Sequence, residues 1–149
     1  MRILLAVDDS KFCEVVANAV IAEMKTNGTK IKLLHVLEPF PVALAEQMGS
    51  KDSPDFTAAR LTIRDQAKGF LSQTANRLRS AGFETSYSLE DGDARQIILD
   101  YAERWPADLI IVGSHGRRGI KAFLMGSVSE AVARYARCSV QIVRIRSDH

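Results

Sequence analysis

The sequence is poor in the residues that build disulfide frameworks, metal sites and membrane spans. Its 149 residues include 2 cysteines, Cys13 and Cys138, which lie far apart and form no CxxC pair, and 3 scattered histidines. No run of about 18 apolar residues occurs, and the apolar run Ile3–Val7 is too short for a signal peptide. These features exclude a disulfide scaffold, give no metal site and predict no transmembrane helix. We therefore expect a cytoplasmic protein that is not attached to a membrane, with both thiols reduced.

An excess of charge of one sign is also absent. The 20 Lys and Arg residues against 18 Asp and Glu give a net charge of +2, which is not the strong positive field of a general nucleic-acid binder. Hydrophobic residues make up 46% of the chain and charged residues 26%, a globular composition that argues against disorder and coiled coil. The length suits one domain and no linker or repeat divides it, so we expect a single domain over residues 1–149.

Short apolar runs alternate with helical patterns along the chain. The expected strands are 3–7, 31–37, 83–89, 109–112 and 140–145. The expected helices begin after Asp9, after Pro54, after Asp93 and at Ser127, with a further short one within 42–48. This order predicts an α/β fold with an open parallel sheet, helices on both faces and right-handed crossovers. The stretch from Glu38 to Pro54 is the least regular, and we expect a loop or lid there.

Local signals predict how the helices start and which faces they bury. Asp9 or Ser10 is expected to cap the first helix, Asp93 to open a capping box with Gln96, and Ser127 to open another with Glu130. Helical spacing predicts the inward side chains of two helices: Phe12, Val15, Val16, Ala19, Val20 and Met24 in the first, and Val128, Ala131, Val132 and Tyr135 in the last.

A glycine-rich segment follows the fourth expected strand. In an open α/β sheet, ligands bind outside the carboxyl ends of the strands. Gly113-Ser114-His115-Gly116-Arg117-Arg118-Gly119 stands at such an end, and Gly126-Ser127 opens the next helix. Glycines let backbone N–H groups approach an anion, and the helix start adds its dipole, so the segment can form a phosphate cradle to which an arginine adds charge. Equally, Gly113 can simply end a strand and Glu130 can serve its own helix.

The residues after the first strand give a second candidate. A carboxylate at a strand's end can accept bonds from ribose hydroxyls, and with Asp9 or Ser10 capping the helix, Asp8 is available for that role. The sequence has no GxxxxGK[ST], no GxGxxG and no GxSxG motif. His35 lies within an expected strand and is interpreted as a hydrogen-bonded structural residue, whereas His115 can meet a phosphate or occupy a turn.

The motif Gly113-x2-Gly116-x9-Gly126-Ser127 resembles the G-x2-G-x9-G-[ST] signature of the universal stress protein family. The opening Ile3-Leu4-Leu5-Ala6-Val7-Asp8-x-Ser10, the His35-Val36 pair and the ending Cys138-Ser139-Val140-Gln141-Ile142-Val143 are also similar to that family. The resemblance covers nearly the whole chain. It implies a Rossmann-like five-stranded sheet in the order 3-2-1-4-5 and membership of the ATP-binding branch.

The resemblance also implies a set of nucleotide-binding positions. Asp8 would meet ribose or adenine, the backbone of Val36 would meet adenine, and Gly113 would approach the ribose. The phosphates would be held by Gly116, Gly126, Ser127 and Val128, with Ser129 nearby and Arg117 at a matching basic position. Mg²⁺ would accompany the triphosphate, and a homodimer would form through the last strand, Val140–Ile145.

We therefore expect an ATP-binding stress-response regulator that acts as a homodimer and in which nucleotide occupancy alters dimer or partner contacts. No evident catalytic base or dedicated metal ligand set is present in the sequence, so weak ATP hydrolysis is the most enzymatic activity that we expect. The alternatives are a slow ATPase or phosphotransferase, a module for AMP or a cyclic nucleotide, and a nucleotide-free interaction protein.

Overall fold

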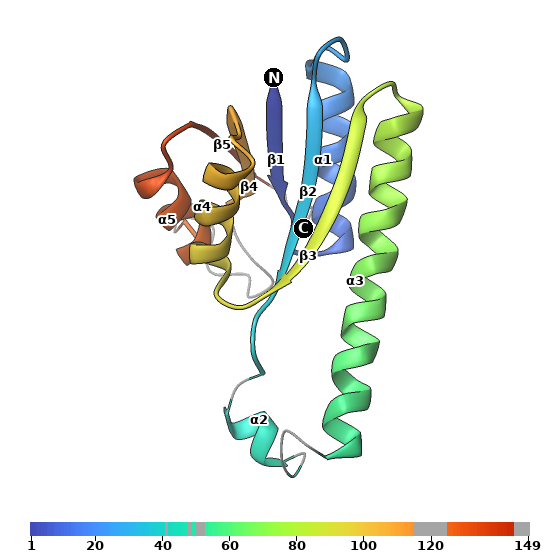
Figure 1. Ribbon diagram of the computed structural model, residues 1–149, viewed down its shortest axis with the longest axis vertical. Coiled ribbons are helices and arrows are strands. Elements are labelled where there is room, and N and C mark those ends of the chain that lie inside the picture. The colour runs from blue at the N-terminus through green and yellow to red at the C-terminus, as the bar shows by residue number, and fades with distance from the viewer. Residues whose placement is uncertain (41, 48, 50–52, 115–124, 145–149) are drawn as a thin grey trace, which may run out of the picture.

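The computed structural model describes residues 1–40, 42–47, 49, 53–114 and 125–144. Its elements are β1 (Arg2–Ala6), α1 (Ser10–Glu23), β2 (Lys30–Leu37), α2 (Val42–Gln47), α3 (Pro54–Ser80), β3 (Glu84–Asp91), α4 (Ala94–Arg104), β4 (Leu109–Gly113), α5 (Ser127–Tyr135) and β5 (Ser139–Val143). The strands are all parallel, in the order β3-β2-β1-β4-β5, which confirms the expected fold and order (Figure 1).

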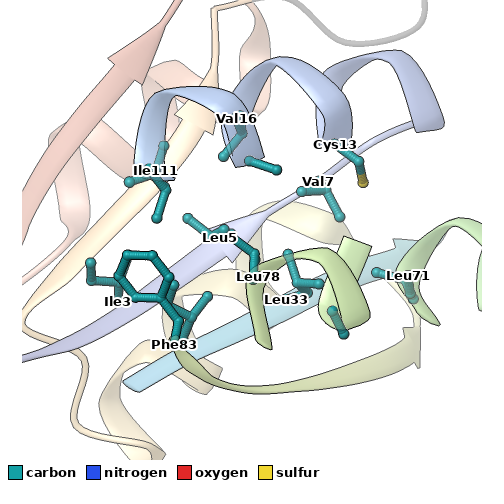
Figure 2. Packing of buried hydrophobic residues seen from close by; sticks show 14 of the residues in the cluster. Ile3, Leu5, Val7, Cys13, Val16, Leu33, Leu71, Leu78, Phe83 and Ile111 are labelled. Atoms are coloured by element: carbon teal, nitrogen blue, oxygen red, sulfur yellow. The ribbon is translucent and has the colours of Figure 1, made fainter. Parts of the chain in front are cut away.

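The sheet is buried between two helical layers. Side chains of β1 and of the following Val7 alternate between these layers. Ile3, Leu5 and Val7 join a cluster with α1 and α3, while Leu4 and Ala6 join one with α4 and α5. Figure 2 shows the first cluster, in which Leu5 lies near Leu33 of β2. Because β1 is covered on both faces, its sequence is a continuous apolar run rather than an alternating one.

The first helix begins as the sequence predicts and buries Phe12, Val16 and Val20 as expected, but the rest of its buried stripe differs. Asp9 is the N-cap, and its carboxylate accepts a hydrogen bond from the N–H of Phe12 at 2.8 Å. Cys13 and Ala17 are buried where Val15 and Ala19 were expected. The two buried residues join the cluster that also contains residues of α3, so the stripe of α1 is set by that helix as well as by the sheet.

The C-terminal part of the fold corrects two further expectations. Tyr135 was expected to point toward the core, but it is 65% exposed. Helix α5 ends at this residue, and the side chains of Ala136 and Cys138 pack against the core cluster instead. The last strand is Ser139–Val143 rather than Val140–Ile145; residue 144 is not in a strand and Ile145 lies outside the described residues.

The irregular stretch after β2 contains the expected short helix, α2. Helix α3 then starts at Pro54, with the hydroxyl of Ser53 as its cap. The N-terminal half of α3 runs past the carboxyl ends of the strands, toward α2 (Figure 1). The expectation of a lid concerns a stretch in which residues 41, 48 and 50–52 lie outside the described residues. Among the helices described, none combines the length and apolar character that crossing a membrane requires.

Candidate functional site

The predicted site residues follow neighbouring strands at one edge of the sheet. Strands β1 and β4 pair directly, with Ala6 opposite Val112, so that Asp8 follows β1 and Gly113 ends the adjacent strand β4. Val36 lies near the end of β2, on the other side of β1. The point between β1 and β4 is where the strand order reverses, which is the usual place for a ligand in this fold class.

The end of β4 is bonded to the start of α5 through one main-chain carbonyl. The oxygen of Ser114 accepts a hydrogen bond from the N–H of Gly126 at 2.7 Å and one from the hydroxyl of Ser129 at 3.2 Å. The same hydroxyl is 3.0 Å from the carbonyl oxygen of Gly126. Since a hydroxyl carries a single proton, the two carbonyls share it. Ser129 is 2% exposed, and its side chain holds Ser114, at the end of β4, next to Gly126, at the start of α5.

The start of α5 differs from the expected capping box. The N-cap is Gly126 rather than Ser127, and no side-chain hydrogen bond caps the helix. The carboxylate of Glu130 pairs with Arg134 at 3.3 Å instead of reaching back. Asp93, in contrast, caps α4 as expected by accepting from the N–H of Arg95. Within the part of the chain that the structure describes, the first turn of α5 therefore presents amide N–H groups and the positive end of the helix dipole with no side-chain cap over them.

Gly113 has a steric reason to be glycine that involves no ligand. A Cβ at this position would lie 3.0 Å from Cε2 and 3.2 Å from Cζ of the Phe12 ring. Phe12 is itself buried in the core cluster. The structure thus explains this glycine by the packing of α1 against the end of β4. Sequence reasoning had counted Phe12 only as a core residue, and no sequence signal links the two positions.

His35 fixes the chain just before Asp8. Its Nδ1 lies 2.7 Å from the carbonyl oxygen of Val7, and because a carbonyl only accepts, Nδ1 carries the proton. The ring is buried and packs edge-on against Phe70 of α3. These contacts confirm His35 as a structural residue and tie β2 to the end of β1.

The remaining candidate site residues form two groups. Asp8, Val36, Gly126, Ser127 and Val128 all lie at the edge described above, and their roles toward a ligand stay predictions. Gly116 of the glycine motif, the neighbouring Arg117 and also His115 lie outside the described residues.

The two cysteines are free of disulfides. Burial raises the pKa of the Cys13 thiol to about 11, which keeps it protonated and unreactive near neutral pH.

We predict that Gly113→Ala destabilises the fold before any ligand is considered. The new methyl meets the buried Phe12 ring, and overpacking of this kind costs about 1–3 kcal/mol of unfolding free energy, measured by urea denaturation. Gly69→Ala is the matched control: it lies within α3 with open space around it, so it should stabilise by roughly 0.5–1 kcal/mol. Phe12→Leu should restore part of the loss in the Gly113→Ala background, and equal effects of the two glycine substitutions would contradict this account.

We predict that truncation of the two serines at the start of α5 has unequal effects on stability. Ser129→Ala removes the buried hydroxyl that joins two carbonyls, so unfolding free energy should fall by about 1–3 kcal/mol. Ser127→Ala changes an exposed side chain and should stay within about 0.5 kcal/mol of wild type. Urea denaturation of both variants measures the contrast, and a Ser129→Ala protein as stable as Ser127→Ala would show that the clamp contributes nothing.

Comparison with known proteins gives one family. The model of the universal stress protein family matches residues 1–144. Universal stress protein A homolog 2 from Coxiella burnetii is 37% identical over 105 residues, which cover 68% of this chain and 70% of that protein.

Solved structures of the same fold extend the comparison. The structure described as hypothetical protein MJ0577 superposes with a TM-score of 0.80 at 25% identity, covering 99% of this chain and 97% of that one. A universal stress protein family protein from Arabidopsis thaliana, solved with AMP bound, gives 0.66 at 21% identity and covers 99% and 93%. Two further neighbours, at 23% and 21% identity, were solved with dAMP and with cAMP.

Proposed function

The chain belongs to the universal stress protein family, and we propose that it binds ATP in the crevice between β1 and β4 and acts as a nucleotide-dependent regulator of the stress response. The observation that carries the proposal is the start of α5. Its N-cap is a glycine without a side-chain cap, held against the end of β4 by the Ser114 carbonyl, within an intact Gly113-x2-Gly116-x9-Gly126-Ser127 motif. Such a helix start suits a phosphate, because its N–H groups and dipole face the anion.

The proposed contacts follow from the edge at which the residues lie. Amides of Gly126, Ser127 and Val128 hold phosphate oxygens, with Gly116 and Arg117 contributing from the glycine loop. Asp8 accepts from ribose or adenine, the backbone of Val36 meets adenine, and Gly113 lies against the ribose. Ser129 supports the phosphate-binding turn through its bonds to main-chain carbonyls. Mg²⁺ accompanies the triphosphate, with most of its ligands from phosphate and water.

An adenine nucleotide with fewer phosphates is the second candidate. Relatives of the same fold were solved with AMP, dAMP or cAMP bound, and the same helix start serves one phosphate as well as three. A slow ATPase or phosphotransferase needs, in addition, a group that activates water or an acceptor. The recovered nucleotide therefore distinguishes these possibilities.

We predict that the nucleotide-stripped protein binds an adenine nucleotide in calorimetry with Mg²⁺ present, ATP more tightly than ADP or AMP. Asp8→Asn should weaken binding about tenfold, since it removes a charge-assisted acceptor. Asp65→Asn, which neutralises an exposed carboxylate of α3, is the matched control and should bind as wild type does.

The outcomes are separable. Intact ATP recovered from the cell supports a regulator, accumulating ADP supports an ATPase, and preference for AMP or cAMP supports the second candidate. Absence of binding by all of these nucleotides would overturn the site and leave a nucleotide-free interaction protein.

We also propose that the protein is a homodimer that pairs β5 with β5 of a second copy in antiparallel fashion. β5 is the last strand of the sheet. The carbonyl of Val143 accepts from Ser114 of the chain that extends β4. By the alternation of a strand, the backbone groups of Gln141 also point toward β4, and those of Val140 and Ile142 point outward. An edge of this kind is available to a second strand.

We predict that hydrogen exchange of β5 depends on protein concentration. The amides of Val140 and Ile142 should be protected at high concentration and lose protection on dilution, because a partner strand pairs with them. The amide of Gln141 is the internal control, since it faces β4 in either state. Sedimentation equilibrium gives the mass in parallel, and a dimer whose Val140 and Ile142 amides exchange rapidly at every concentration would place the interface elsewhere.

A further inference from the structure

A cavity lies at the same edge of the sheet but outside the proposed nucleotide site. It occupies about 250 Å³ between the end of β2 and the N-terminal half of α3, the part of that helix that extends beyond the strands (Figure 1). Its apolar walls are Leu37, Phe40, Phe56, Leu61 and Ile63. The two phenylalanine rings meet edge to face, with centroids 5.1 Å apart, so one wall is aromatic.

Two arginines line the cavity and share one carboxylate. Arg60 Nη2 lies 3.0 Å from Asp91 Oδ1, and Arg64 Nη1 lies 3.1 and 3.0 Å from the two oxygens of the same group. Asp91 therefore balances one of the two positive charges. Each guanidinium carries five N–H groups, and the bonds to Asp91 engage one nitrogen of each. Planar guanidinium groups of this kind suit a further carboxylate.

One acidic residue, Glu38, belongs to the lining itself. The Oε1 atom of Glu38 accepts a hydrogen bond from the N–H of Ala94 at 3.4 Å, at the start of α4. Its charge lowers the positive potential of the cavity but leaves the paired arginines as the cationic groups of the rim. The guanidinium of Arg60 also lies 5.9 Å from the centre of the Phe40 ring, which places a cation beside the aromatic wall.

Alternation along β2 separates this cavity from the nucleotide crevice. His35 contacts Phe70 of α3, and Leu37 lines the cavity on that same side of the sheet. Val36, between them, packs with the cluster of α4 and α5. The N-terminus of α5 belongs to this second side. The proposed nucleotide site and this cavity therefore lie on opposite faces of β2, since the neighbouring residues Val36 and Leu37 point to different faces.

We propose that this cavity is a second ligand site, for a small organic acid that combines an aromatic body with one carboxylate. The aromatic body lies against Phe40 and Phe56, and the carboxylate meets the guanidinium groups of Arg60 and Arg64. The volume agrees with this class: a cavity of about 150 Å³ holds benzene, so 250 Å³ admits a ring with a short acidic arm.

The test uses the full-length protein and 3-phenylpropanoate as the probe, followed by amide chemical shifts in NMR. We expect a dissociation constant on the order of 1 mM, with shifts centred on residues 37–40 and 56–64. Two control compounds separate the parts of the ligand. Acetate lacks the aromatic body and 3-phenylpropanol lacks the charge, and each should bind at least about tenfold more weakly. Equal binding of 3-phenylpropanol, or no binding of the probe, overturns the proposal.

Variants that remove positive charge and a variant that removes negative charge should change the affinity for the probe in opposite directions. The double substitution Arg60→Gln with Arg64→Gln should weaken binding of the probe about tenfold or more. Asp91→Asn releases both guanidinium groups and should strengthen binding about threefold. Arg77→Gln removes the same charge from the other end of α3, where the arginine bonds to Asn18, and should change nothing. Thermal unfolding of each variant verifies that it is folded. Unchanged affinity in both the double variant and Asp91→Asn contradicts the assignment.

Competition with AMP distinguishes this site from the nucleotide site. Saturating AMP should leave the probe bound, because the two ligands occupy opposite faces of β2. If AMP displaces the probe competitively, the cavity belongs to the nucleotide site and the proposal of a separate site is wrong. If no nucleotide binds at all, the proposed function fails while binding of the probe is still measurable, so that the two failures can be told apart.

Discussion

The carbonyl oxygen of Ser114 is the point on which the candidate site depends. It accepts from the N–H of Gly126 and from the buried hydroxyl of Ser129, and so brings the ends of the glycine segment together, although these residues are twelve and fifteen positions apart in the chain. The N–H of the same residue bonds to Val143 of β5. The two backbone groups of this one residue thus fix the end of β4, the start of α5 and the edge strand relative to one another. This small set of bonds holds the N-terminus of α5, the positive end of its dipole, beside the end of β4.

Features that depend on neighbouring residues in sequence could be predicted. The continuous apolar run Ile3–Val7 indicated a buried strand, which is confirmed. Asp9 or Ser10 was expected to cap the first helix, and Asp9 is the residue that does. The sheet order came from the resemblance to a family and is also confirmed. Features that depend on tertiary contacts were predicted less well. Ser127 and Glu130 have the spacing of a capping box, yet the N-cap is Gly126, whose N–H bonds to the distant Ser114 carbonyl, and Glu130 pairs with Arg134.

Packing explains the other differences. The clash that makes Gly113 a glycine involves Phe12, about one hundred positions earlier, and no local pattern carries that information. Tyr135 fits the inward face of α5 by spacing, but the helix ends there and its side chain is exposed. The aromatic cavity beside α3 was also missed, since Phe40 belongs to the irregular stretch after β2 and Phe56 to the helix expected after Pro54, and no pattern links the two. A pairing between distant residues leaves no periodic signal.

The position of β1 has a consequence for the order in which the chain is built. The first strand made is the middle strand of the sheet, and its pairing with β4 must wait until the ribosome has added Leu109–Gly113. Until then β1 to β3 and their helices can assemble, but one edge of β1 is unpaired and the side chains of Leu4 and Leu34 lack the neighbours that β4 and α5 supply. Synthesis from the amino terminus therefore passes through a stage in which one apolar face of the β1–β3 sheet is incompletely covered. A chaperone that shields apolar strands would act on that stage rather than on the finished protein.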